Sequence, residues 1–131
     1  MKNYAGTIIE ESLDDTKVLN QVRIVSTRVS KVTNRHQTPW LKQWTLHTVK
    51  IASKIADTTA QILSLDLERK HPWFADFKNG KTHYIVFPHK IFKVDMQSKE
   101  QYDLAKAYGI SLGIPDYQVD FQPLEQKKKF V

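Results

Sequence analysis

The sequence predicts an α+β fold: a ferredoxin-like antiparallel sheet with two helices on one face and an N-terminal strand-pair extension. From residue 43 onward, segments with strand and helix periodicity alternate as β, α, β, β, an additional β, α, β, which is the split βαβ pattern. The chain has 131 residues, of which 40% are hydrophobic, and this is enough for one core. We therefore expect a single domain over residues 1–122 and a basic C-terminal tail over 123–131.

The strands are expected where β-branched and aromatic residues recur between turn residues. The dipeptide Asn79-Gly80 is the strongest turn signal, because both residues tolerate a positive φ. In the long segment that follows residue 20, the alternation slips near Ile24 and Val25, which predicts a β-bulge. The expected strands cover residues 4–11, 21–33, 43–51, 73–78, 82–87, 91–95 and 117–121.

Three helices are expected from capping residues and from apolar residues at helical spacing. Asp14 and Asp15 favour a helix start because carboxylates stabilise a helix N-terminus. Ser98 followed by Gln101 is typical of a capping box, and Gly109 is typical of the residue after a helix. The expected helices cover residues 14–20, 52–67 and 99–108.

The strand expected over residues 82–87 carries apolar or aromatic side chains on both faces. Tyr84 and Val86 fall on one face, and Ile85 and Phe87 fall on the other. Strands of this kind are usually covered on both sides. Because two helices on one face would cover only one side, we expect the other to meet the N-terminal strands, a second subunit or a ligand. A homodimer is therefore among the expectations.

Positive charge is concentrated in one segment of the chain. Residues 16–56 contain eight of the twenty Lys and Arg residues but no Asp or Glu. The rest of the chain has twelve basic and fourteen acidic residues, so the net charge of +6 arises from this segment. Such a segment attracts anions, and nucleic acid, a phosphorylated ligand and an acidic protein are the alternatives.

Basic side chains in this segment interleave with two tryptophans, which suits single-stranded nucleic acid because cations hold phosphates and rings stack on bases. Simple alternation places Arg23 and Lys31 on one face of their strand and Arg28 on the other. The alternative is a solvated sheet edge that Lys and Arg protect from aggregation, with the tryptophans in the core. The candidate residues for binding nucleic acid or another polyanion are Arg28, Lys31, Arg35, Trp40, Lys42 and Trp44.

A second group of polar and aromatic side chains lies on the expected central strands. Asp76 could orient the imidazole of a histidine on a neighbouring strand for acid–base chemistry or for binding a small molecule. The alternative is a purely structural hydrogen bond between the two. The sequence does not determine strand register, so both interpretations stay open. This alternative pocket comprises His47, Trp73, Asp76, His83 and Tyr84.

Several kinds of site lack their sequence patterns. The chain contains no cysteine, which excludes disulfides, thiolate metal sites and cysteine nucleophiles and favours a reducing compartment. The five histidines and four glycines form no metal-binding or phosphate-binding motif. The RNP1 pattern and a KH-type Gly-x-x-Gly loop are also missing, which weighs against sequence-specific RNA binding. We expect no cofactor, no metal and no assigned catalytic residue.

The leading hypothesis is a non-enzymatic cytoplasmic binding domain for an anionic partner, with nucleic acid first among the candidates. The first residues lack the apolar run of a signal peptide, and no apolar run is long enough to cross a membrane. We therefore expect no membrane partner. The two alternative functions are a small-molecule or catalytic site on the sheet face and an accessory subunit that binds another protein.

Four runs of the sequence resemble a family of small uncharacterised prokaryotic single-domain proteins. The runs are WLKQWTLH at 40–47, WFADFK at 73–78, HYIVF at 83–87 and YGISLGIP at 108–115. The resemblance extends through Phe121 and implies a single intact domain. The family has no established function, so the resemblance implies no site residues.

Overall fold

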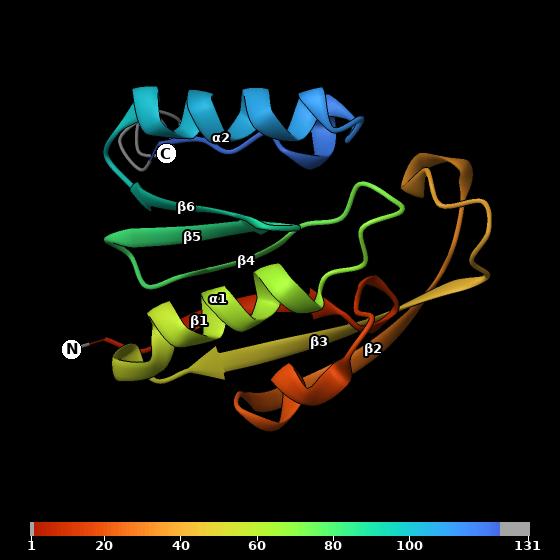
Figure 1. The fold of residues 1–131 in the computed structure, drawn as a ribbon, viewed down its shortest axis with the longest axis horizontal. Coiled ribbons are helices and arrows are strands. Elements are labelled where there is room, and N and C mark those ends of the chain that lie inside the picture. Colours follow the sequence, from red (N-terminus) through yellow and green to blue (C-terminus); the bar gives the residue numbers. More distant parts are fainter. Residues whose placement is uncertain (1, 124–131) are drawn as a thin grey trace, which may run out of the picture.

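The computed structural model describes residues 2–123, which form a six-stranded sheet and two α-helices (Figure 1). The strand order is β2-β3-β1-β4-β5-β6, and every neighbouring pair is antiparallel. This confirms the α+β class. Most of the expected basic tail, from residue 124 onward, lies outside the described residues. The strands are β1 (Tyr4–Ile9), β2 (Arg23–Lys31), β3 (Gln43–Ile51), β4 (Ala75–Lys78), β5 (Thr82–Phe87) and β6 (Lys90–Asp95), and the helices are α1 (Ala56–Asp66) and α2 (Lys99–Ser111).

Strand β1 lies in the middle of the sheet, between β3 and β4. Tyr4 lies opposite Ile51 of β3, and Gly6 lies opposite Phe77 of β4. Because β1 is antiparallel to both neighbours, β3 and β4 run parallel to each other, and α1 provides the crossover that such a pair requires. The two N-terminal strands are both present but do not pair with each other; β1 and β2 each pair with β3.

The two helices pack against opposite faces of β5. Tyr84 and Val86 belong to the core that contains the buried residues of α1, whereas Ile85 and Phe87 belong to the core that contains the buried residues of α2. The expectation of two helices on one face is therefore wrong, because periodicity identifies the apolar stripe of a helix but not the side of the sheet that it covers. Since the chain itself covers both faces of β5, this strand no longer gives a reason to expect a second subunit.

Most predicted elements are confirmed in position. The helix expected over 14–20 is the short 3₁₀ helix η2 (Thr16–Asn20), and two elements are corrected at the C-terminal end. The β-bulge lies between Ile24 and Ser26, and the Ser98 side chain accepts a hydrogen bond from the Gln101 N–H at the start of α2. Helix α2 continues past Gly109 to Ser111. The strand expected over 117–121 is wrong, because this part of the chain contains the short 3₁₀ helix η5 (Asp116–Gln118).

Close packing explains both corrections. A Cβ atom on Gly109 would lie 2.9 Å from a methyl carbon of Val119 and 3.3 Å from the Phe87 ring. The glycine therefore lets the segment after η5 approach the helix, and it does not end the helix. Val119 is fully buried in this contact. Its apolar character, which suggested a strand, serves packing against α2.

The sheet face on the α2 side is covered over β4, β5 and β6 but not over β1, β2 and β3. Figure 1 shows α2 beyond β6, far from β2. Antiparallel partners share a face, so the register assigns one continuous exposed surface to the uncovered strands. We call this surface the open face, and it comprises Ala5, Thr7, Arg23, Ser26, Arg28, Thr48, Lys50 and, at its border on β4, Lys78.

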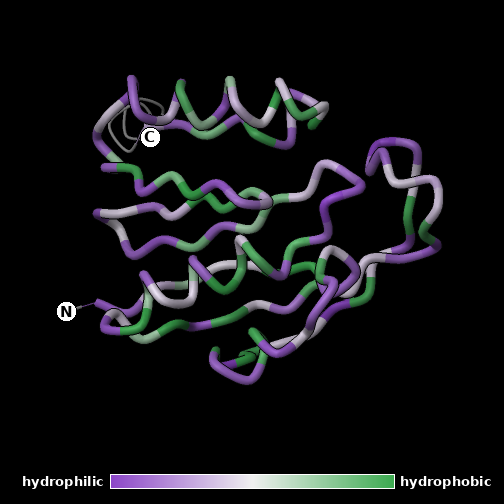
Figure 2. The backbone as a smooth tube through the Cα atoms, in the orientation of Figure 1, coloured by the Kyte–Doolittle hydropathy of each residue, from purple (hydrophilic) through white to green (hydrophobic). Residues whose placement is uncertain are grey.

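The connection between β2 and β3 differs in hydropathy from the strands and helices. Figure 2 shows hydrophobic residues concentrated in the strands and in the helices, whereas hydrophilic residues dominate the connection between β2 and β3. That connection contains the 3₁₀ helix η3 (Asn34–His36). It lies beside the end of the open face and is the least apolar part of the basic segment.

We predict that Gly6→Ala destabilises the protein by about 1–3 kcal/mol, because overpacking forces the backbone to shift. A Cβ atom at Gly6 would lie 2.1 Å from the carbonyl oxygen of Asp76 and 2.8 Å from the Cα atom of Phe77, so β1 and β4 would have to separate. Urea unfolding measures the effect. Ala5→Ser, at the exposed neighbouring position on β1, is the control, and equal unfolding midpoints for the two variants would contradict the prediction.

Candidate functional site

A groove of about 430 Å³ opens on the α2 side of the sheet, at the end of the open face. It is lined by residues of β1, β3 and β4, of the segment before β4, and of η3 and η5. The volume is within the range of small-ligand sites. The residues that matter for its chemistry are Arg35, Trp44, Trp73, Phe74, Asp76 and Tyr117. The groove therefore joins members of both candidate groups identified in the sequence.

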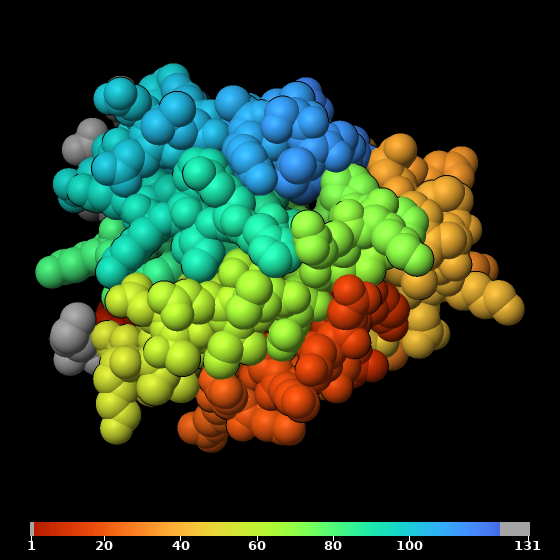
Figure 3. All heavy atoms as spheres, in the orientation of Figure 1, coloured from red at the N-terminus to blue at the C-terminus, as the bar shows by residue number. Residues whose placement is uncertain are grey.

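One wall of the groove is formed where η3 meets η5, two segments about eighty positions apart in the chain. The Tyr117 hydroxyl donates a hydrogen bond to the Arg35 carbonyl oxygen. The Gln118 side-chain amide donates to the carbonyl oxygens of Arg35 at 3.3 Å and His36 at 3.4 Å. The Arg35 guanidinium lies 4.3 Å from the centroid of the Tyr117 ring, a cation–π contact. Figure 3 shows these two segments in contact at the surface. Arg35 is thus held beside the groove.

The three tryptophans of the chain gather around the same connection. The Trp44 and Trp73 rings are 5.6 Å apart, centroid to centroid, and Trp40 stacks on the His71 ring at 3.7 Å. The Trp44 indole N–H donates to the Thr38 hydroxyl at 2.9 Å. Trp73 is buried, Trp44 is half-buried and Trp40 is exposed. These rings pack on one another, and two of them, Trp44 and Trp73, also line the groove.

Asp76 lies in the groove and is hydrogen-bonded to a buried histidine. Its Oδ2 atom lies 2.6 Å from Nε2 of His83, and Nδ1 of His83 lies 2.9 Å from the Tyr102 hydroxyl. The Asp76 side chain is 32% exposed, whereas that of His83 is 5% exposed. A ligand in the groove can therefore reach the carboxylate of Asp76 but not the imidazole of His83.

The protonation state of Tyr102 determines how this chain of hydrogen bonds runs. Burial raises the pKa of Tyr102 to about 12, and the negative charges of Asp76 and Asp95 add to the shift. The hydroxyl therefore keeps its proton at neutral pH and can donate to Nδ1 of His83. In the neutral imidazole the ring proton is then on Nε2, which donates to Asp76. The histidine acts here as a positioning residue for the carboxylate.

Sequence reasoning missed Tyr102. Helix α2 buries Tyr102, Ala105 and Gly109. Leu104 is 60% exposed. The spacing of three between Tyr102 and Ala105 was the available signal. This spacing is easily overlooked, because Leu104 is more apolar than Tyr102 and suggests a different buried face for the helix.

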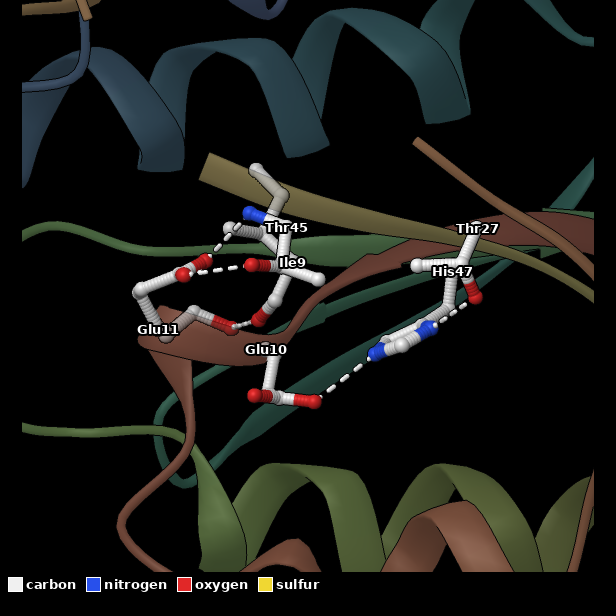
Figure 4. A network of polar contacts seen from close by, with 7 residues as sticks. Ile9, Glu10, Glu11, Thr27, Thr45 and His47 are labelled. Atoms are coloured by element: carbon white, nitrogen blue, oxygen red, sulfur yellow. Dashed lines mark hydrogen bonds and ion pairs between the residues drawn. The ribbon is translucent and has the colours of Figure 1, made fainter. Parts of the chain in front are cut away.

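Two members of the alternative pocket, His47 and Tyr84, lie on the other side of the sheet. The His47 imidazole lies between the Thr27 hydroxyl, 2.9 Å from Nδ1, and the Glu10 carboxylate, 2.9 Å from Nε2 (Figure 4). Tyr84 donates a hydrogen bond to Asp57, which lowers the pKa of that carboxyl, while burial raises the pKa of the phenol. These two residues therefore do not share a site with Asp76.

The network in Figure 4 has a structural purpose. Strand β1 ends at Ile9, opposite Leu46, so β3 continues toward Gln43 without β1 as a partner. Glu11 takes the place of that partner, since its carboxylate accepts from the Thr45 N–H at 2.5 Å and from the Thr45 hydroxyl at 2.7 Å. The interaction satisfies backbone that the sheet leaves unpaired.

The predicted polyanion-binding residues are divided between the two faces of β2. Arg28 lies on the open face, opposite Leu46, whereas Lys31 lies opposite Gln43 and so falls on the α1 side. The bulge shifts the alternation and places Arg23 on the face of Arg28, which corrects the expectation from simple alternation. Lys42 is exposed in the connection between β2 and β3.

Four cations thus project from or border the open face: Arg23, Arg28, Lys50 and Lys78. All four are exposed. No carboxylate among residues 2–123 forms an ion pair with any of them, although four Lys–carboxylate ion pairs are found elsewhere in that part of the chain. Of these four, only Arg28 was among the predicted candidates; Arg23, Lys50 and Lys78 join it on this face through the strand register.

Other kinds of site find little support in the described part of the chain. No three His, Asp or Glu side chains among these residues converge in a way that could hold a metal ion. None of the described helices has the length and apolar character needed to cross a membrane.

Comparisons of the chain with protein-family models, with curated proteins and with solved structures gave no match. The resemblance to a small prokaryotic family therefore stays a prediction. The function must be inferred from the open face and the groove.

We predict that Tyr102→Phe reduces the loss of stability at alkaline pH. The folded-state pKa of Tyr102, about 12, lies above the ordinary value of 10.0. The unfolded chain therefore releases this proton first, and the free energy of unfolding falls as the pH rises from 10 toward 12. Between pH 9 and 11 the wild type should lose about 1 kcal/mol more than the variant. Urea unfolding at both pH values measures this, and equal losses would show that Tyr102 does not titrate late.

Proposed function

We propose that this protein is a non-enzymatic domain that binds single-stranded nucleic acid along the open face, with the groove at one end of the path. The observation that carries the proposal is the set of exposed cations on one side of the sheet. Arg23 lies opposite Lys50, Lys50 lies opposite Ala5, and Ala5 lies opposite Lys78. This row crosses four adjacent strands, so three positive charges follow one line across the sheet.

Phosphates bound along this row would release condensed counterions, which gives sequence-independent affinity that falls with salt. Arg28 lies in a second row, nearer the groove, where it faces Leu46. Arg35 continues the positive charge to the groove itself. The cations therefore lead from the open half of the sheet toward the aromatic side chains.

The aromatic side chains favour a single strand over a duplex. Bases in a single strand are free to stack on rings, and each such contact is worth roughly 1–3 kcal/mol. Trp44, Phe74 and Tyr117 line the groove and supply these rings. A duplex would present only its phosphates to the open face. An acidic polypeptide would match the charge but has no bases to stack on the aromatic rings.

The proposal includes a cytoplasmic location, which suits a chain without cysteine. The Asp76 carboxylate also supports a second function for the same groove, the binding of a small molecule that donates hydrogen bonds. A ligand of that kind would raise the melting temperature by mass action.

We predict that Arg28→Gln weakens binding of a fluorescently labelled twelve-nucleotide single strand, whereas Lys31→Gln has a much smaller effect. Both changes remove one positive charge from β2, but only Arg28 lies on the open face. Fluorescence anisotropy at 50 and 200 mM salt measures the affinity. The slope of log K against log salt should become shallower by about 0.7 for Arg28→Gln, as for one phosphate contact on a single strand.

Labelled duplex and polyglutamate are the comparison ligands. Tighter binding of the single strand than of either supports the proposal. Equal effects of the two substitutions would place the contact elsewhere than on the open face, and failure of the single strand to bind at 50 mM salt would overturn the proposal.

A further inference from the structure

We propose that the groove beside Asp76 binds a guanine base, with the Asp76 carboxylate accepting hydrogen bonds from its N1–H and 2-amino groups. The inference deepens the proposed function, because the base would belong to the bound strand, and it rests on that function to this extent. A free guanine nucleotide presents the same edge, so the site can be tested without a strand.

The Asp76 carboxylate can accept a further hydrogen bond. His83 donates to Oδ2 of Asp76 at 2.6 Å, and no hydrogen bond from the described residues reaches Oδ1. An ionised carboxylate only accepts hydrogen bonds. The complementary ligand must therefore donate, and a carboxylate on a side chain that is only 32% exposed gains more from a donor than a fully exposed one does.

The nucleobases differ in the donors that they present on their Watson–Crick edges. Guanine presents two adjacent donors on its Watson–Crick edge, the N1–H and the 2-amino group. In adenine and cytosine the amino group lies next to a ring nitrogen that accepts, and in uracil the single N–H lies between two carbonyl groups. These acceptors would face the carboxylate and be repelled. Reading of an unstacked base by this edge is the usual basis of selectivity for single strands.

The surroundings of Asp76 suit a nucleotide. The groove of about 430 Å³ is lined by Trp44, Phe74 and Tyr117, which can pack against a flat heteroaromatic ring. The Arg35 guanidinium, which contacts the Tyr117 ring at 4.3 Å, lies beside the groove and can bind the phosphate of the same nucleotide. A simple cation such as a guanidinium compound would also satisfy Asp76, but Arg35 would repel it.

Residues behind Asp76 hold its carboxylate in a fixed orientation. His83 is buried between Asp76 and Tyr102, and its ring is also in edge contact with the Phe121 ring at 5.5 Å. The imidazole therefore has little freedom to turn. A carboxylate held in this way can discriminate between ligands that differ by one donor.

The test compares GMP with IMP, which lacks only the 2-amino group, and with AMP. Quenching of the fluorescence of Trp44 and Trp73 reports binding to the wild-type protein. We expect GMP to bind about tenfold more tightly than IMP, as for one hydrogen bond to a charged acceptor, and AMP to bind more weakly than both. Equal affinities for GMP and IMP, or tighter binding of AMP, would overturn the inference.

Asp76→Asn should remove the preference, so that GMP and IMP bind alike, because the amide offers one acceptor and one donor. Asp103→Asn is the matched control, since Asp103 is an exposed residue of α2 that pairs with Lys99 at 2.7 Å. A preference that survives Asp76→Asn contradicts the inference. If Asp76→Asn does not fold, the comparison of GMP with IMP on the wild type decides.

The two proposals fail in different ways. If a guanine-free single strand binds with a salt dependence that Arg28→Gln reduces, but GMP and IMP bind equally, the inference is wrong and the proposed function stands. If GMP is preferred while no single strand binds, the guanine site stands and the proposed function is wrong.

Discussion

The fold depends on the insertion of β1 between β3 and β4, and this insertion depends on the close approach of β1 and β4 at Gly6. Any Cβ atom there would overlap the backbone of β4. The approach sets Thr7 opposite Asp76 and Gly6 opposite Phe77, which keeps Phe77 in the core beneath α1 and Asp76 on the other face. A shift of one residue would exchange these faces. The position of the carboxylate in the groove therefore follows from the smallest side chain in the sheet.

The partial cover by α2 creates the candidate site. On one sheet face, β4 to β6 lie under the helix and the segment that follows it, whereas β1 to β3 lie open to solvent. The covered half shelters the His83–Tyr102 pair, and the open half presents unpaired cations. Asp76 lies at the border between them, with His83 behind it and the groove in front. At this border a buried residue, His83, holds Asp76 in place, while the Asp76 carboxylate stays accessible to a ligand. A binding site needs both properties.

The sequence was most informative where a local pattern decides the structure. The hairpin at Asn79-Gly80 and the strands β3 and β5 follow from turn residues and alternation, and the bulge at Ile24 was visible as a slip in that alternation. The sequence did not reveal which residues of different strands lie beside one another. Asp76 lies opposite Ile85, and His83 lies opposite Lys78, so the pair is a diagonal contact that appears only once the register is known.

Strand β2 forms one edge of the sheet, and its composition has a consequence for the behaviour of the protein at high concentration. An exposed edge of nine residues with apolar side chains such as Val25 and Val29 is a template for joining copies into a continuous ladder. The bulge interrupts the flat pairing surface, and Arg23, Arg28 and Lys31 would bring like charges together if two β2 strands aligned. The positive charges of the basic segment thus also oppose edge-to-edge association of two copies, although no other element covers β2.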